Sequence, residues 1–118
     1  IAVLSIGTIG NKLIELQADL PKNKVAHYAM RFVKPLDEKM LHKVFKKFET
    51  IVTIEDGAIM GGFGSAILEF ASNNNYTNKT VKHLGIPDHF VEHGKVDELF
   101  ESIHLSKEKI VEFLIKLL

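Results

Sequence analysis

The first six residues, Ile-Ala-Val-Leu-Ser-Ile, are almost all apolar and constrain the fold more than any other segment. A strand with one face in water alternates apolar and polar residues, whereas a strand covered on both faces is apolar at nearly every position. The segment therefore predicts a strand in the interior of a mostly parallel sheet with helices on both sides.

The rest of the chain alternates strand-like and helix-like segments. Further strands are expected at residues 25–30, 50–54 and 81–86. Apolar stripes at helical spacing are expected within residues 13–20, 40–48, 66–71, 96–103 and 110–118. Strands that alternate with helices specify a sheet between two helical layers, with right-handed crossovers. The sequence thus predicts an α/β fold, a three-layer α/β/α sandwich with a mostly parallel sheet of four or five strands.

Two polar residues mark helix starts, and one helix is unusually apolar. Asp37 and Ser106 stand before apolar stripes and are the predicted N-caps. The helix carrying residues 66–71 is nearly apolar all round, so we expect it to be deeply buried.

Size and composition limit the possible organisation and partners. A chain of 118 residues with 46% hydrophobic content can bury one core, so a single domain over residues 1–118 is expected. Lysine plus arginine equals aspartate plus glutamate at 15 each, which argues against nucleic-acid or membrane partners. No apolar stretch reaches the roughly 20 residues of a membrane helix. The default expectation is a cytoplasmic location.

The chain begins at Ile1, already inside an apolar run and without an initiator methionine. We therefore expect it to be part of a longer protein. It contains no cysteine, which excludes disulfides, thiol catalysis and thiolate metal sites.

The segment after the third expected strand holds a cluster of glycines, Gly61, Gly62 and Gly64. Glycine-rich turns between a strand and a helix either bind phosphate through backbone N–H groups or allow close packing. No P-loop or dinucleotide fingerprint is present, and Glu55 and Asp56 would repel an anion. Close packing is the favoured interpretation, with anion binding and a subunit contact as alternatives.

The acidic pair Glu55 and Asp56 follows a parallel strand, where open α/β sheets usually carry their functional residues. Adjacent residues on an extended segment point in opposite directions, so the two do not form a working carboxylate pair. Asp56 suits a loop or a helix cap. Glu55 is the better functional candidate, as a buried carboxylate hydrogen-bonded to a neighbouring element or subunit.

Three further residues are candidates for an interface. Arg31 follows the second expected strand, where it is either ordinary solubilising charge or a salt-bridge partner of Glu55 or Asp56, if strands two and three are neighbours. Asp88 and His93 lie in the segment that leads away from the fourth strand, and both remain interface candidates.

The sequence contains no recognisable catalytic or metal motif. Its six histidines form neither an H-E-x-x-H signature nor an H-x-x-x-H pair within a helix. Its serines lie outside any G-x-S-x-G elbow. We therefore assign no catalytic, cofactor-binding or metal residue.

Three blocks together resemble the C-terminal third of the 1-deoxy-D-xylulose-5-phosphate synthase family, which belongs to the transketolase superfamily. The blocks are Met-Arg-Phe-Val-Lys-Pro-Leu-Asp at 30–37, Glu-Asp-Gly-Ala-Ile-Met-Gly-Gly-Phe-Gly-Ser at 55–65, and Gly-Ile-Pro-Asp at 85–88 with Glu-His-Gly at 92–94. They stand in the family's order and at similar spacing. One departure is Ala29, where the family commonly has aspartate or asparagine.

The resemblance implies the function of a larger enzyme. That family condenses pyruvate with glyceraldehyde 3-phosphate and supplies isoprenoid, thiamine and pyridoxal pathways. Its first two domains bind thiamine diphosphate and magnesium, and its third domain, which has a five-stranded mixed sheet, packs on them and contributes to a homodimer. The fragment alone is expected to be inactive, and no cofactor is expected within it. The alternative is an independent small α/β protein that binds an anionic ligand at the glycine turn.

Overall fold

The computed structural model describes residues 1–7, 9–31, 35–58, 62–86 and 106–118, with the backbone alone at 56–58 and 86. The expected helix within residues 96–103 lies outside the described residues.

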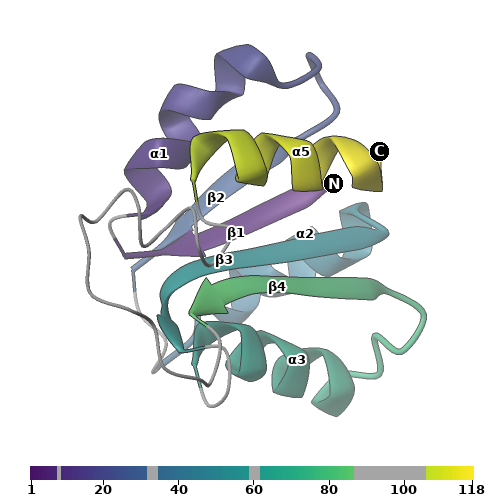
Figure 1. Ribbon diagram of the computed structural model, residues 1–118. Coiled ribbons are helices and arrows are strands. Elements are labelled where there is room, and N and C mark those ends of the chain that lie inside the picture. The colour runs from purple at the N-terminus through teal and green to yellow at the C-terminus, as the bar shows by residue number, and fades with distance from the viewer. Residues whose placement is uncertain (8, 32–34, 59–61, 87–105) are drawn as a thin grey trace.

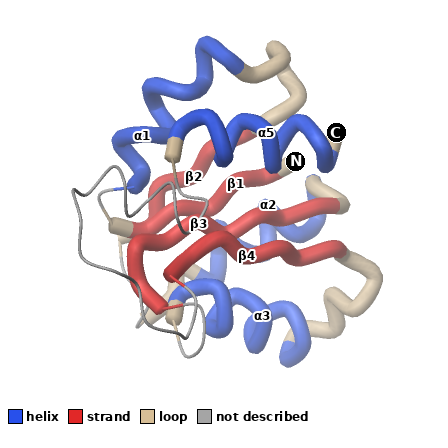
Figure 2. The backbone as a smooth tube through the Cα atoms, in the orientation of Figure 1, coloured by secondary structure: helices blue, strands red, loops and turns tan. Residues whose placement is uncertain are grey.

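Four strands form one sheet in the order β2-β1-β3-β4, and each neighbouring pair is parallel (Figure 2). The strands are β1 (Ala2–Ile6), β2 (Ala26–Met30), β3 (Thr50–Ala58) and β4 (Thr80–Ile86). The prediction of a parallel α/β sheet is confirmed. Among the described residues there is no counterpart of a fifth strand, so the mixed character of the sheet stays a prediction.

Helices cover both faces of the sheet, which gives the predicted three layers (Figure 1). On one face lie α1 (Ile9–Leu16), which continues into the 3-10 turn η1 (Gln17–Asp19), and α5 (Lys107–Leu117). The other face carries α2 (Glu38–Lys47) and α3 (Phe63–Asn73). No helix in the described part of the chain is long and apolar enough to span a membrane.

The near-continuous apolar strands fill two cores, one on each side of the sheet. On β1, Leu4 joins the core under α2 and α3, while Val3 joins the core under α1 and α5. On β3, Ile51 joins the core under α2 and α3, and Val52 joins the core under α1 and α5. Successive side chains of a strand point to opposite faces, so an interior strand needs apolar residues at both parities. This confirms the prediction drawn from the first six residues.

Both predicted N-caps are confirmed. Asp37 Oδ1 accepts a hydrogen bond from the Met40 N–H of α2 at 3.1 Å. Ser106 Oγ accepts one from the Lys109 N–H of α5 at 3.3 Å. Each bond satisfies an N–H group that the first helical turn would otherwise leave without a partner.

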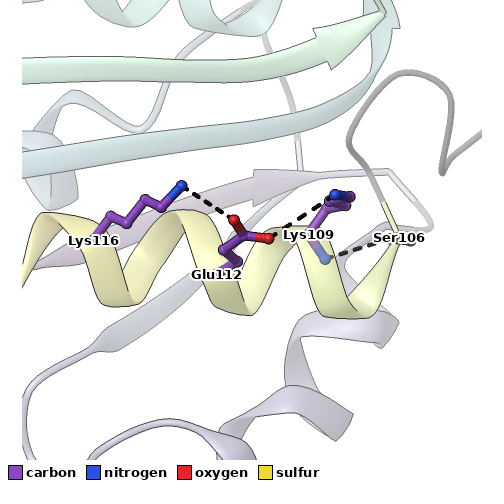
Figure 3. A network of polar contacts seen from close by, with 4 residues as sticks. All are labelled: Ser106, Lys109, Glu112 and Lys116. Carbon is purple, nitrogen blue, oxygen red and sulfur yellow. Dashed lines mark hydrogen bonds and ion pairs between the residues drawn. The ribbon is translucent and has the colours of Figure 1, made fainter.

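Charged side chains lie along one side of α5 (Figure 3). Glu112 lies between Lys109, at 4.0 Å, and Lys116, at 3.1 Å. The spacings of three and four residues bring these groups onto one side of the helix. Exposed ion pairs of this kind stabilise a fold little, so the position of α5 depends on its buried residues Ile110 and Leu114.

Two sequence-based expectations differ from the structure. β3 runs to Ala58 instead of ending near residue 54, with a register irregularity between Ile54 and Ala58 opposite β4. Glu55 still pairs with Ile6 of β1 and Ala58 pairs with Ile86 of β4, so the extension is anchored at both ends despite the weak strand propensity of Asp56 and Gly57 between them. In α3, Leu68 is 50% exposed, so the helix buries one face and is not buried all round.

We predict that Ile110→Ala will lower the free energy of unfolding by about 2–5 kcal/mol, because it opens a cavity in the core under α1 and α5. Ile110 is fully buried, whereas Ile115 on the same helix is 48% exposed. Ile115→Ala is therefore the matched control and should cost less than about 1 kcal/mol. Urea unfolding measures both; equal losses would contradict the assignment of the buried face of α5.

Candidate functional site

The carboxyl ends of the parallel strands form the edge where α/β sheets usually bind ligands. The structure brings three of the sequence-derived candidates together at the end of β3: Glu55, Gly62 and Gly64. Arg31 lies at the same edge, after β2. Asp56 is described by its backbone alone, within β3. The candidates Gly61, Asp88 and His93 lie outside the described residues.

Glu55 holds the first turn of α3. Its side chain is 4% exposed, and Oε1 accepts the Phe63 N–H at 3.1 Å while Oε2 accepts the Gly64 N–H at 2.7 Å. The first N–H groups of a helix have no partner within it and carry partial positive charge, so a carboxylate is well suited to this place. Glu55 thus caps α3 from the strand that precedes it.

Local sequence explains why the cap comes from a strand. Gly62 is the N-cap residue of α3 and has no side chain that could accept a hydrogen bond. Glu55 shares the strand parity of Ile51, whose side chain faces α2 and α3. The carboxylate therefore reaches the start of α3 on the correct side of the sheet.

Close packing in the glycine cluster occurs at Gly64. A Cβ atom there would lie 2.5 Å from His83 Nδ1 and 2.9 Å from Thr53 Oγ1, which is closer than side chains approach. Gly62 has φ −90° and ψ −158°, an extended conformation open to any residue. Of the two glycines of this cluster that the structure describes, Gly64 is the one that needs to be a glycine, because the sheet lies directly against α3.

Two hydroxyl–imidazole pairs lie against the helices, one on each face of the sheet. Thr53 Oγ1 is 2.8 Å from His83 Nδ1 under α3, and Ser5 Oγ is 2.7 Å from His27 Nε2 on the opposite face. A Cβ atom at Gly10 of α1 would lie 3.0 Å from Ser5 Oγ, which mirrors the approach at Gly64. Neither pair is predicted from the sequence, in which His27 and His83 stand out only as possible metal ligands. Ser5, a hydroxyl inside an apolar strand, was the available signal.

Burial lowers the pKa of both paired histidines, since a charged imidazolium loses hydration between sheet and helix. The neutral ring is therefore the form that the fold favours. Within the described ranges, no group of three or more His, Asp or Glu side chains is placed to hold a metal ion.

The proposed pairing of Arg31 with the acidic pair assumed that strands two and three are neighbours, and this assumption is wrong. β1 lies between β2 and β3. Arg31 is exposed at the end of β2, whereas both Glu55 oxygens accept hydrogen bonds from α3. Strand order cannot be read from the local sequence, because it depends on where each crossover helix returns the chain.

Comparison with known proteins decides the family. Residues 1–110 match the family model described as transketolase, C-terminal domain. The chain belongs to this family.

Its relatives include proteins named 1-deoxy-D-xylulose-5-phosphate synthase. One from Cytophaga hutchinsonii is 54% identical over 112 residues, covering 93% of this chain and 18% of that protein. Another, from Bacteroides thetaiotaomicron, is 50% identical over 119 residues, covering 98% and 18%. The chain thus spans about a fifth of the length of these relatives, and the resemblance drawn from the three sequence blocks is confirmed.

A solved structure supports the fold. The protein titled "Split gene transketolase, inactive beta4 tetramer" aligns with a TM-score of 0.80 at 24% identity, covering 98% of this chain and 38% of that one. At this identity the likeness establishes the architecture, which is that of a transketolase-type α/β domain.

We predict that Gly64→Ala will lower the free energy of unfolding by about 1–3 kcal/mol, because the added methyl group overlaps His83 and Thr53. In an ordinary helix the same change is favourable. Gly62→Ala is the control and should change stability by no more than about 1 kcal/mol. If Gly64→Ala is as stable as the parent in chemical denaturation, the close approach at Gly64 carries no energetic weight.

We also predict that stability falls with pH below about 6.5, the ordinary pKa of histidine. Folding lowers the pKa of His27 and His83. At a pH between the folded and the unfolded pKa, these two histidines therefore bind more protons in the unfolded chain than in the folded one. The stability that the two neutral histidines contribute is fully present above pH 6.5 and is lost as the pH falls through their lowered folded pKa values. Urea unfolding from pH 7.5 to 5 measures this loss, and the double variant His27→Gln, His83→Asn should show a shallower dependence. Identical slopes for parent and variant would refute it.

Proposed function

We propose that residues 1–118 form one domain, the third and C-terminal domain of a 1-deoxy-D-xylulose-5-phosphate synthase, and that its role is structural. In this proposal the domain packs against the remaining domains and supports a homodimer, and the reaction takes place outside these residues. Its membership of the transketolase C-terminal domain family and its synthase relatives support the parent enzyme.

The observation that carries the structural role is the state of Glu55. It is the functional candidate best placed at the carboxyl edge of the sheet, yet both oxygens of its buried carboxylate accept backbone hydrogen bonds from α3. A general acid or base must reach a substrate proton. A carboxylate that is 4% exposed and hydrogen-bonded to a helix start instead holds the first turn of α3 in place.

The parent enzyme would condense pyruvate with glyceraldehyde 3-phosphate, using thiamine diphosphate and magnesium. We place both cofactors in the domains outside this chain. A cytoplasmic location stays a prediction.

The alternative, an independent protein that binds an anion at the glycine turn, is disfavoured by the same carboxylate. An anion at the start of α3 would use the N–H groups of Phe63 and Gly64, which already donate to Glu55. It would also meet the negative charge of Glu55 at close range. The turn is therefore better suited to packing than to anion binding.

The test compares Glu55→Gln with the parent in the full-length enzyme. A structural role predicts that kcat for the condensation at low temperature is nearly unchanged, while the temperature of irreversible inactivation falls by several degrees because α3 loses a charge-assisted cap. The matched control is Glu69→Gln, the same change at an exposed position of α3, which should leave both quantities unchanged.

Two results would contradict the proposal. A large loss of kcat at every temperature, without lower thermal stability, would make Glu55 part of the reacting centre. Full-length protein without synthase activity would exclude the proposed parent reaction.

A further inference from the structure

Some charged groups at the carboxyl edge of the sheet have partners within the described part of the chain, and one does not. The Asp37 carboxylate accepts the Met40 N–H at the start of α2, and Glu55 caps α3, so two helix starts at this edge have an internal anion. Arg31 lies at the same edge with its side chain exposed. In the described part of the chain, its guanidinium makes neither a hydrogen bond nor an ion pair.

Arg31 also lines a cavity of about 270 Å³ at the end of β2. Its lining residues are Ala29, Met30, Arg31, Pro35, Asp37 and Met40. Most of the described lining residues are apolar, and the polar groups among them are the Arg31 guanidinium and the Asp37 carboxylate that caps α2. The cavity can thus accept a group that combines an apolar stem with one negative charge.

Asp37 helps to distinguish between two kinds of occupant. A free phosphate ion would meet the Asp37 charge on entering the cavity and would gain nothing from the apolar wall. A glutamate or aspartate on a protein segment can place its methylene groups against Met30 and Met40 and its carboxylate on Arg31, and the backbone N–H groups of that segment can donate to Asp37. The cavity therefore favours an acidic side chain over a free anion.

We propose that Arg31 binds a carboxylate of a protein segment outside these 118 residues, in the remaining part of the synthase. A guanidinium and a carboxylate can form a bidentate pair. The side chains of Met30 and Met40 would exclude water from this pair and so strengthen it. The inference rests on the proposed function, in which the rest of the protein, about four-fifths of the length of the relatives, packs against this domain.

The experiment uses the full-length protein with Arg31→Glu, Arg31→Ala and Arg31→Lys. Limited proteolysis measures how fast the C-terminal domain is released, and hydrogen exchange measures protection of residues 26–47. Arg31→Glu should speed release by about tenfold or more, since it replaces an interdomain ion pair with like charges. Arg31→Lys should fall between Arg31→Ala and the parent, because an ammonium group keeps the charge but loses the bidentate geometry.

The matched control is Lys43→Glu, the same charge reversal at an exposed position of α2 away from the cavity lining. If Arg31→Glu releases the domain no faster than Lys43→Glu, the inference is wrong. A second result would also contradict the inference. In it, millimolar inorganic phosphate protects residues 26–47 in the parent and not in Arg31→Ala, and the two proteins release the domain at equal rates. The cavity would then bind a small anion.

These outcomes are separate from those that test the proposed function. An active synthase that is insensitive to changes at Arg31 would remove this inference alone. Wild-type protein without synthase activity would remove the proposed reaction, and the release rates would still decide whether Arg31 binds another part of the protein.

Discussion

The fold around the carboxyl edge depends on one buried charge, the Glu55 carboxylate. Burying a carboxylate without partners is very unfavourable, but here the N–H groups of Phe63 and Gly64 donate to both oxygens and the positive end of α3 faces the charge. The interaction links the end of a central strand to the start of the next helix. It fixes where α3 begins, although its N-cap residue Gly62 has no side chain.

The same strand sets how close the helix lies. Because Thr53 and Glu55 share one face of β3, the hydroxyl–imidazole pair with His83 sits directly under the turn that Glu55 caps. Only a residue without Cβ fits between them, and Gly64 is that residue. A cap, a partly buried polar pair and a glycine are thus parts of one arrangement at the start of α3.

Local patterns predicted those features that depend on local physics. Strand and helix alternation, coverage of β1 on both faces, and the caps at Asp37 and Ser106 follow from periodicity and from the unpaired N–H groups of a helix start. The hydrogen-bond partners of the Glu55 carboxylate, eight and nine residues further along the chain, could be identified only from the structure. The pairing suggested for Arg31 failed because β1 separates β2 from β3, an arrangement that crossovers determine and short segments do not encode.

The two halves of the carboxyl edge differ in a way that bears on how the domain works. At β3, the described polar side chains Thr53 and Glu55 are buried and hydrogen-bonded within the chain, so these two groups are not available to a charged partner. At β2, an exposed guanidinium lies beside a partly apolar cavity, and only its neighbour Asp37 is engaged internally. In the proposed docking, the exposed guanidinium at β2 selects a partner by charge, whereas the Glu55 carboxylate at β3, on the far side of β1, is satisfied within the chain.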